Sequence, residues 1–215
     1  MNIRLYQRAD EAAVREICFQ TALYGQPMQQ AIPDPALISE SLVGYYLRFE
    51  PDALWIAEES GQVVGYLSGG LDPRRYERRY VLSIAPRLGW LFLRHGHLFH
   101  RRSWQLLAHS VRMVRPWRRI HAALTGEYTA HCHINVRSGC QGQGVGRQLM
   151  ARFLNDLAVR GVSGVYLTTA TEAGKAFFDR LGFVVLAREW MPEFLGLPPH
   201  ELWLMARRVE PAAGP

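Results

Sequence analysis

The chain has 215 residues, a hydrophobic fraction of 48% and a formal net charge of +6. This length fits one large domain or one domain with an insertion. No run of about 18 uncharged apolar residues occurs, so no membrane-spanning helix is predicted. The N-terminus lacks the apolar stretch of a signal peptide, and three cysteines without metal-ligand spacing argue against a disulfide framework. We therefore expect a cytoplasmic protein.

The first third of the chain predicts a strand, two helices and a hairpin. Residues 3–8 are typical of a strand, and apolar residues at helical spacing follow Asp10, which is expected to be the N-cap. A second helix is predicted to begin near Pro35. Two strand-like runs, 53–58 and 63–68, flank a Ser-Gly turn that suits a hairpin.

Residues 73–121 carry the basic character of the chain. They contain 12 arginines and one acid, a net +11, so the rest of the chain sums to −5. Their apolar residues predict two or three helices, with breaks at Pro86, Gly89, Gly96 and Pro116.

Strands alternate with helices after this segment. Helices are predicted from Val145 to Arg160 and from Glu172 to Leu181. The predicted strands are 128–136, 164–170, 183–190 and 201–209. The whole pattern indicates an α/β (α+β) fold, in which a mixed sheet has helices on both faces.

A glycine-rich stretch joins the strand that ends at Val136 to the helix that begins at Val145. Residues 136–147 read VRSGCQGQGVGR. A strand, a glycine-rich turn and a helix together present backbone N–H groups and the positive end of a helix dipole to an anion. This stretch therefore predicts an anion-binding loop.

Two motifs resemble the GNAT superfamily of N-acetyltransferases. Gln141 to Gly146 is similar to the acetyl-CoA signature Gln/Arg-x-x-Gly-x-Gly/Ala, and Phe177 to Phe183 resembles the family's Phe-Tyr-x-x-Leu-Gly-Phe. The resemblance leaves 73–121 unexplained. It implies a GNAT fold, with a mostly antiparallel sheet of about seven strands that splays between strands four and five. Residues 1–215 would form a single domain with a helical insertion between strands three and four.

The same resemblance implies acetyl-CoA as the co-substrate and no metal. The implied pyrophosphate-binding residues are Gln141, Gly142, Gln143, Gly144, Val145, Gly146 and Arg147. The pantetheine arm would lie in the split of the sheet, and the remaining implied cofactor-binding residues are Ile134, Asn135, Val136, Thr169 and Phe178. A backbone N–H near Val136 would polarise the thioester carbonyl. For Gln141, the alternative is a turn residue whose side chain points to solvent.

The implied reaction is direct attack of a neutral amine on the acetyl thioester in a ternary complex. It requires removal of a proton from the amine and protonation of the CoA thiolate. The sequence departs from the family here, because Phe178 aligns with the tyrosine that usually protonates the thiolate, and Thr171 aligns with a common asparagine. The thiolate then leaves unprotonated or water protonates it, or catalysis is weak. The alternative function is a non-catalytic acyl-CoA-binding or sensing module.

Candidate catalytic residues are His131, His133 and Asn135, which share one strand face because side chains alternate. A histidine suits a general base near neutral pH. Serotonin N-acetyltransferase, a relative within the superfamily, also has two histidines spaced i, i+2 on this strand, but its register is shifted by one residue, which would reverse the face. The order Ala-His-x-His-Ile-Asn resembles more closely the acetyltransferase-like domains found beside O-GlcNAcase modules. The alternative is a pair of hydrogen-bonded core histidines. Metal ligation by the pair lacks a third ligand nearby in sequence.

The arginine-rich segment has three interpretations. The first is a helical cover with a solvated basic face, and the second is a lid whose arginines bind an acidic group of the acceptor. The third and least favoured is contact with a membrane surface through 86–107 or with nucleic acid, for which no motif is present. The expected partner is therefore a small-molecule or peptide amine, with no nucleic acid, bound by a monomer or homodimer. Trp190 and Trp203 line the acceptor pocket or pack in the core.

Overall fold

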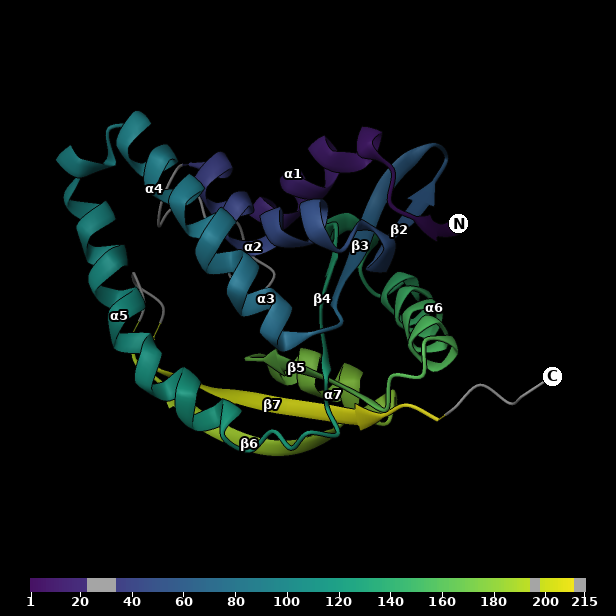
Figure 1. The fold of residues 1–215 in the computed structure, drawn as a ribbon. Helices are drawn as coiled ribbons and strands as arrows, with labels where there is room; N and C mark the ends of the chain where they lie inside the picture. The colour runs from purple at the N-terminus through teal and green to yellow at the C-terminus, as the bar shows by residue number, and fades with distance from the viewer. Residues whose placement is uncertain (23–33, 194–197, 211–215) are drawn as a thin grey trace.

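The structure, a computed structural model, describes residues 1–22, 34–193 and 198–210. One sheet has the strand order β1-β2-β3-β4-β5-β7-β6, with β4 parallel to β5 and every other neighbouring pair antiparallel. The strands are β1 (Asn2–Leu5), β2 (Leu54–Glu59), β3 (Gln62–Gly70), β4 (Ala130–Val136), β5 (Gly164–Thr169), β6 (Val184–Met191) and β7 (His200–Arg208). The predicted fold class is confirmed (Figure 1).

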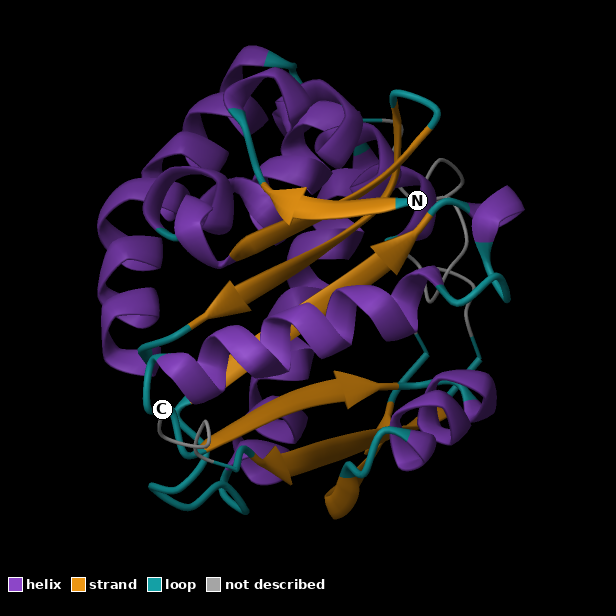
Figure 2. Cartoon of the chain, turned by 90° about the vertical axis from the view of Figure 1, so that its right-hand side faces the viewer, coloured by secondary structure: helices purple, strands orange, loops and turns teal. Residues whose placement is uncertain are grey.

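Helices cover both faces of the sheet. Those outside the insertion are α1 (Glu11–Thr21), α2 (Pro35–Phe49), α6 (Val145–Val159) and α7 (Glu172–Arg180), with 3₁₀ turns η1 (Arg8–Asp10), η3 (Pro51–Ala53) and η6 (Ser138–Cys140). Helices α1, α2 and the insertion lie on one face, and α6 and α7 lie on the other, which Figure 2 shows with α6 across the strands. Leu149, Phe153 and Leu157 of α6 are fully buried, because they recur on the side of the helix that meets the sheet.

The first strand is shorter than the predicted 3–8. It ends at Leu5, because η1 follows and the chain folds back on itself. Asp10 takes the predicted N-cap position of α1 but does not cap that helix with its side chain. Its carboxylate instead accepts from the Gln7 N–H at 2.8 Å and from the Arg4 guanidinium at 2.7 Å.

The insertion is helical, as predicted. α3 and α4 form one continuous segment through a π-helical turn, η4, and a 3₁₀ turn, η5, separates this segment from the long helix α5. The bounds are α3 (Pro73–Arg79), η4 (Tyr80–Ile84), α4 (Ala85–Arg94), η5 (His97–Phe99) and α5 (Arg101–His121).

Only one of the four predicted breaks ends a helix. Gly96 has a φ of +70°, which suits glycine and turns the chain between α4 and η5. Pro86 and Gly89 lie within α4, and Pro116 lies inside α5. The wider turn η4 directly before Pro86 makes room for the proline ring, which would clash with a regular preceding turn. Pro116 costs α5 one helical hydrogen bond but does not end it, because this part of α5 packs on β6.

The continuous segment α3–α4 packs on α2 through aromatic and charged side chains. The rings of Tyr45 and Tyr76 lie 4.6 Å apart between centroids, and Ile84 is fully buried beside them. The buried carboxylate of Glu40 on α2 lies 3.3 Å from the Arg87 guanidinium of α4. These contacts hold the insertion against the face of the sheet that α2 covers.

A second anchor joins the end of α4 to the start of α2. Asp34 caps α2 by accepting from the Leu37 N–H at 3.0 Å, and its Oδ2 atom lies 2.7 Å from His95 Nδ1 and 2.6 Å from His97 Nε2. His97 Nδ1 in turn lies 2.9 Å from Ser103 Oγ. Burial alone would raise the pKa of Asp34, but its hydrogen bonds outweigh this effect and lower it. We call Asp34, His95, His97 and Ser103 the Asp34 clamp.

Replacing Asp34 is expected to destabilise the protein. Asp34→Ala removes the cap of α2 and leaves two histidines without their acceptor, so we expect the free energy of unfolding to fall by roughly 2–4 kcal/mol. Asp34→Asn keeps a good capping side chain and should lose less. Urea unfolding of the two variants at pH 7 measures the difference. Equal losses would show that the cap adds nothing and that the contacts with the two histidines account for the whole effect.

Candidate active site

The sheet splits between its two parallel strands. β4 pairs with β5 only at Ala130–Val165 and His131–Tyr166, although β4 continues to Val136. Beyond His131, β4 remains paired with β3, so it has one unpaired side that faces β5. The predicted splay between strands four and five is therefore confirmed.

The glycine-rich loop lies at the end of this split. Gly142 and Gly144 have φ values of +76° and +82°, and Gly144 is the N-cap of α6. A Cβ atom on either glycine would meet nothing within 4 Å, so glycine is needed there for its conformation and not for lack of space. Among the described residues, no side chain caps the first turn of α6. The N–H groups of that turn are therefore available to an anion.

The side chain of Gln141 stabilises the glycine-rich loop by a hydrogen bond to the end of β4. Its side-chain amide donates to the Val136 carbonyl at 3.1 Å, and Gln143 similarly donates to the Gly139 carbonyl at 3.2 Å. The Gln141 side chain is exposed but does not simply point into solvent, since it ties the loop to the end of β4.

Two apolar side chains lie beneath the first turn of α6. A Cβ atom on Gly146 would lie 3.2 Å from Phe177 and 3.6 Å from Ile134, so this turn rests directly on both. Phe178 is buried in the core of the α6 face, and Thr169 is half-buried at the end of β5. Sequence reasoning named Ile134, Phe178 and Thr169 but not Phe177, although Phe177 belongs to the motif that carried the resemblance.

His131 is a core histidine. It is 8% exposed, its Nε2 lies 2.7 Å from the hydroxyl of the buried Tyr46, and its ring fills the space over Gly70, where a Cβ would lie 2.2 Å away. Burial, and to a smaller extent the neighbouring His133 and His121, lower the pKa of His131 to about 3. His131 is therefore neutral at pH 7 and matches the predicted alternative of a hydrogen-bonded core residue.

His133 differs from His131 in being exposed. It pairs with Ser68 of β3, and its ring lies 5.8 Å from that of Tyr46, on the face of the sheet that α2 covers. Although part of the side chain is exposed, the protein packed around the ring desolvates the imidazolium and lowers the pKa of His133 to about 4. His133 is thus neutral at pH 7 and accessible to a bound molecule, two residues beyond the last pair between β4 and β5.

Asn135 has a hydrogen-bonding role within the fold. Its side-chain amide donates to the hydroxyl of Tyr66 at 2.8 Å, and Tyr66 is fully buried beneath α1 and α2. The two residues pair across β3 and β4, so this bond fixes the strand end that precedes the glycine-rich loop.

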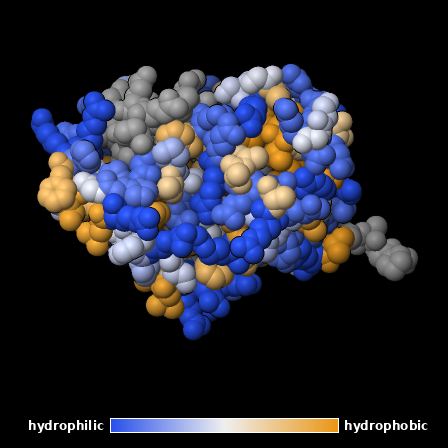
Figure 3. Space-filling model, turned by 90° about the horizontal axis from the view of Figure 1, so that it is seen from above, coloured by the Kyte–Doolittle hydropathy of each residue, from blue (hydrophilic) through white to orange (hydrophobic). Residues whose placement is uncertain are grey.

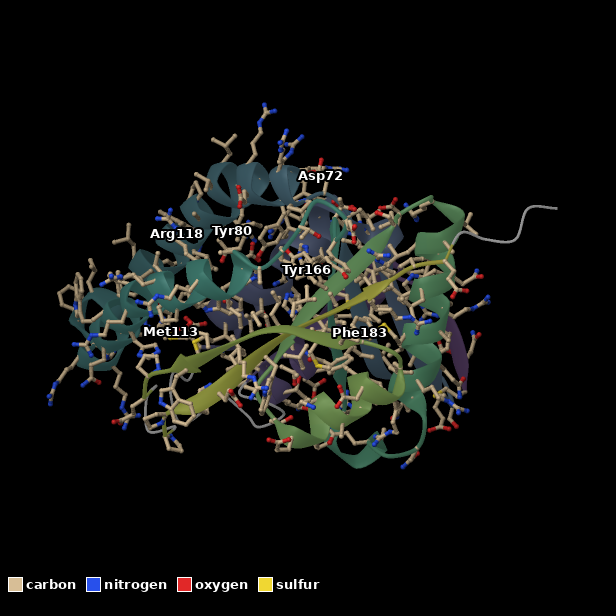
Figure 4. The ribbon with its side chains drawn as sticks, turned by 90° about the horizontal axis from the view of Figure 1, so that it is seen from below. Asp72, Tyr80, Met113, Arg118, Tyr166 and Phe183 are labelled. Atoms are coloured by element: carbon tan, nitrogen blue, oxygen red, sulfur yellow. The ribbon has the colours of Figure 1, made fainter. Side chains whose placement is uncertain are left out.

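A group of aromatic side chains extends from the insertion to β5 across His131. Tyr76 lies 5.6 Å from Tyr80 and 4.9 Å from His131 between ring centroids, and His131 lies 5.7 Å from Tyr166. His121 at the end of α5 lies 5.9 Å from Tyr166. Figure 4 labels Tyr80 and Tyr166 on their two elements. The sequence alone did not indicate this group, because its members come from three distant segments.

Other predicted residues lie outside this region. Trp190 is exposed on β6, and Trp203 is buried in the core of the α6 face, which matches its predicted core alternative. Within the described parts of the chain, one group could hold a metal ion, namely Asp34, His95 and His97. Their mutual hydrogen bonds already account for that arrangement.

Acid is expected to destabilise the protein through His131. Its pKa is lowered in the folded state, so the unfolded state binds the proton first and stability falls as the pH drops below about 6.5. We expect His131 to contribute a loss of about 1.4 kcal/mol per pH unit between pH 6.5 and 5, in addition to that of His133, whose pKa is also lowered. Urea unfolding at several pH values measures the total slope. His131→Gln should reduce this slope by about the contribution of one histidine, and an unchanged slope in that variant would assign the acid sensitivity to other groups.

This chain is similar in sequence and in fold to known acetyltransferases. The model of the acetyltransferase (GNAT) domain matches residues 110–185. The crystal structure of SsHAT is similar over 97% of this chain and 98% of that chain, with 30% sequence identity and a TM-score of 0.74. The chain therefore belongs to the GNAT family of N-acetyltransferases, whose reactions use acetyl-CoA.

More distant structures share the fold. A ribosomal-protein-alanine N-acetyltransferase from Brucella melitensis is 18% identical with a TM-score of 0.60, covering 97% of this chain and 99% of that chain. The structure of yncA from Salmonella typhimurium with its cofactor acetyl-CoA is also 18% identical with a TM-score of 0.60, covering 100% and 97%.

Proposed function

We propose that this GNAT enzyme transfers the acetyl group of acetyl-CoA to the amine of a small molecule or peptide, in a ternary complex. Residues 1–215 act as one acetyltransferase domain in this proposal, with 73–121 inserted in it. The observation that carries the proposal is the split between β4 and β5, which opens directly beside both the glycine-rich loop and the exposed His133.

The donor would bind along the split and the loop. The pyrophosphate is held by backbone N–H groups of residues 141–147, at the uncapped first turn of α6. The pantetheine arm bonds to the unpaired side of residues 134–136, as an additional strand would. Ile134 and Phe177 form the apolar support under this part of the cofactor, with Thr169 and Phe178 on the β5 side.

His133 is the proposed general base. The amine nitrogen attacks the acetyl carbonyl carbon, the C–S bond breaks, and the acetyl group passes to nitrogen. His133 takes the proton that the amine loses, and the CoA thiolate leaves and takes a proton from water, because α7 has phenylalanine where the family has tyrosine. A neutral imidazole at pH 7 is in the correct protonation state for this step.

His131 and Asn135 position this strand in the proposal and do not take protons. The low pKa of His131 and its contact with Tyr46 hold it neutral, and Asn135 is bonded to Tyr66. This assignment narrows the predicted catalytic set of three residues to His133.

Thiol release from acetyl-CoA tests the proposal across a panel of polyamines, amino sugars and peptide α-amines. We expect turnover with at least one class, and isothermal titration should show acetyl-CoA binding without any acceptor. Binding without turnover across the panel would favour the acyl-CoA-sensing alternative, which the absence of the α7 tyrosine supports. No binding of acetyl-CoA would contradict both.

A further inference from the structure

The insertion exposes an unusual share of the apolar surface. Of the 17 large hydrophobic side chains that are exposed in the described parts of the chain, 11 lie between residues 81 and 117. This segment is a small part of the molecule, and soluble proteins rarely gather exposed apolar side chains in this way without a partner.

Six of these side chains surround the turn between α4 and α5. They are Trp90, Leu93, Leu98, Phe99, Trp104 and Leu107. We call residues 90–107 the elbow. Phe99 at its tip is 89% exposed. Figure 3 shows hydrophobic side chains at the left edge of the molecule, where the elbow lies, bordered by hydrophilic ones.

The fold holds the elbow in place. The Asp34 clamp fixes the residues on either side of Leu98 and Phe99, since His97 contacts both Asp34 and Ser103. The Trp104 indole N–H donates to the Leu98 carbonyl at 2.9 Å. The exposure of Phe99 is therefore a property of a fixed turn between two helices.

Apart from the buried carboxylate of Asp34 in the clamp, the charged side chains of the elbow and of its flanking helices are arginines. Arg94 and Arg101 are exposed at the adjoining helix ends, and residues 78–121 contain ten arginines and no Asp or Glu. A second copy of the chain on this surface would bring arginines against arginines. Nucleic acid would match the charge but would leave Leu98 and Phe99 without an apolar partner. An anionic lipid surface matches both the charge and the apolar tip.

We propose that the elbow binds the surface of an anionic phospholipid bilayer. Leu98 and Phe99 enter the boundary between headgroups and acyl chains, Trp90 and Trp104 lie at the interface, and the arginines meet the lipid phosphates. None of the helices in the described parts of the chain has the length and apolarity needed to cross a membrane. The elbow and α6 lie at opposite sides of the molecule in Figure 1, so binding leaves the glycine-rich loop open to solvent.

Co-sedimentation of the purified full chain with vesicles tests this proposal. We expect binding to phosphatidylcholine vesicles that contain phosphatidylglycerol and much weaker binding to pure phosphatidylcholine. Arg94→Gln with Arg101→Gln should weaken partitioning roughly 30-fold, since each basic residue near an anionic surface contributes about 1 kcal/mol. Leu98→Ser with Phe99→Ser should weaken it by at least a similar factor.

The matched control removes exposed apolar side chains elsewhere. Val159 and Val184 are also exposed but lie on α6 and β6, so Val159→Ser with Val184→Ser should leave partitioning unchanged. All variants should keep the wild-type melting temperature, because the altered side chains are exposed. No binding to anionic vesicles, or equal losses in the control, would overturn the proposal. The proposal would also be contradicted if the wild type were a dimer that the Leu98→Ser, Phe99→Ser variant cannot form. DNA binding that is unchanged in that variant would contradict it as well.

Discussion

Gly144→Asp is expected to abolish binding of coenzyme A, with at least about a 100-fold loss of affinity. The carboxylate would lie at the N-terminus of α6, where the proposed pyrophosphate is held, and two like charges about 4 Å apart repel by about 4 kcal/mol at an effective dielectric constant of 20. The position has room for the side chain, because a Cβ there meets nothing within 4 Å. Isothermal titration with CoA measures the loss.

Gly144→Asn separates charge from backbone strain. Gly144 has a φ of +82°, and Asn and Asp are the residues that tolerate this region best after glycine. Both variants carry the same strain and nearly the same shape, so Asn should retain most of the affinity that Asp loses. An aspartate at this position also interacts favourably with the dipole of α6. The melting temperature of the Gly144→Asp variant should therefore not fall below that of the Gly144→Asn variant. Equal affinities for the two variants would place the pyrophosphate elsewhere.

His133→Ala is expected to lower kcat by about 10²–10⁴-fold, the usual contribution of a general base. The affinity for acetyl-CoA should change little, because His133 points to the α2 face and not along the glycine-rich loop. Steady-state kinetics with a saturating acceptor, together with titration of the donor, measures both quantities. Added imidazole should restore part of the lost rate.

The pH dependence gives a second readout for His133. Its pKa is lowered, so the neutral base persists to lower pH and kcat of the wild type should hold until well below pH 6.5. His133→Gln should remove the fall in kcat at low pH that protonation of His133 causes. If His133→Ala instead mainly lowers the melting temperature and leaves kcat intact, His133 is a structural residue like His131.

The seven strands could be predicted because each has a local signal. Alternating apolar residues and glycine-containing turns mark them, and the glycine-rich loop follows β4 directly in sequence. The glycine-rich loop, where we propose that the donor binds, was therefore predictable from consecutive residues. The breaks in the insertion were not, since Pro116 is tolerated inside α5 only because this helix packs on β6.

The environments of the two histidines could not be predicted from β4 alone. Alternation places both on one face, but Tyr46 of α2 and Tyr76 of the insertion surround His131 and leave His133 exposed. These contacts depend on segments far away in the sequence. The same holds for the Asp34 clamp, which joins residues about 60 positions apart, 61 for His95 and 63 for His97.

The split between β4 and β5 also bears on how the protein behaves without its cofactor. An unpaired strand side inside a sheet has the same hydrogen-bonding groups as an exposed edge strand, and such edges attract other extended chains. In the proposed complex the cofactor occupies the split, completes the sheet and binds only the folded state. The stability of the protein is then linked to the concentration of free acetyl-CoA, and it rises by about 2.7 kcal/mol when that concentration is 100 times the Kd.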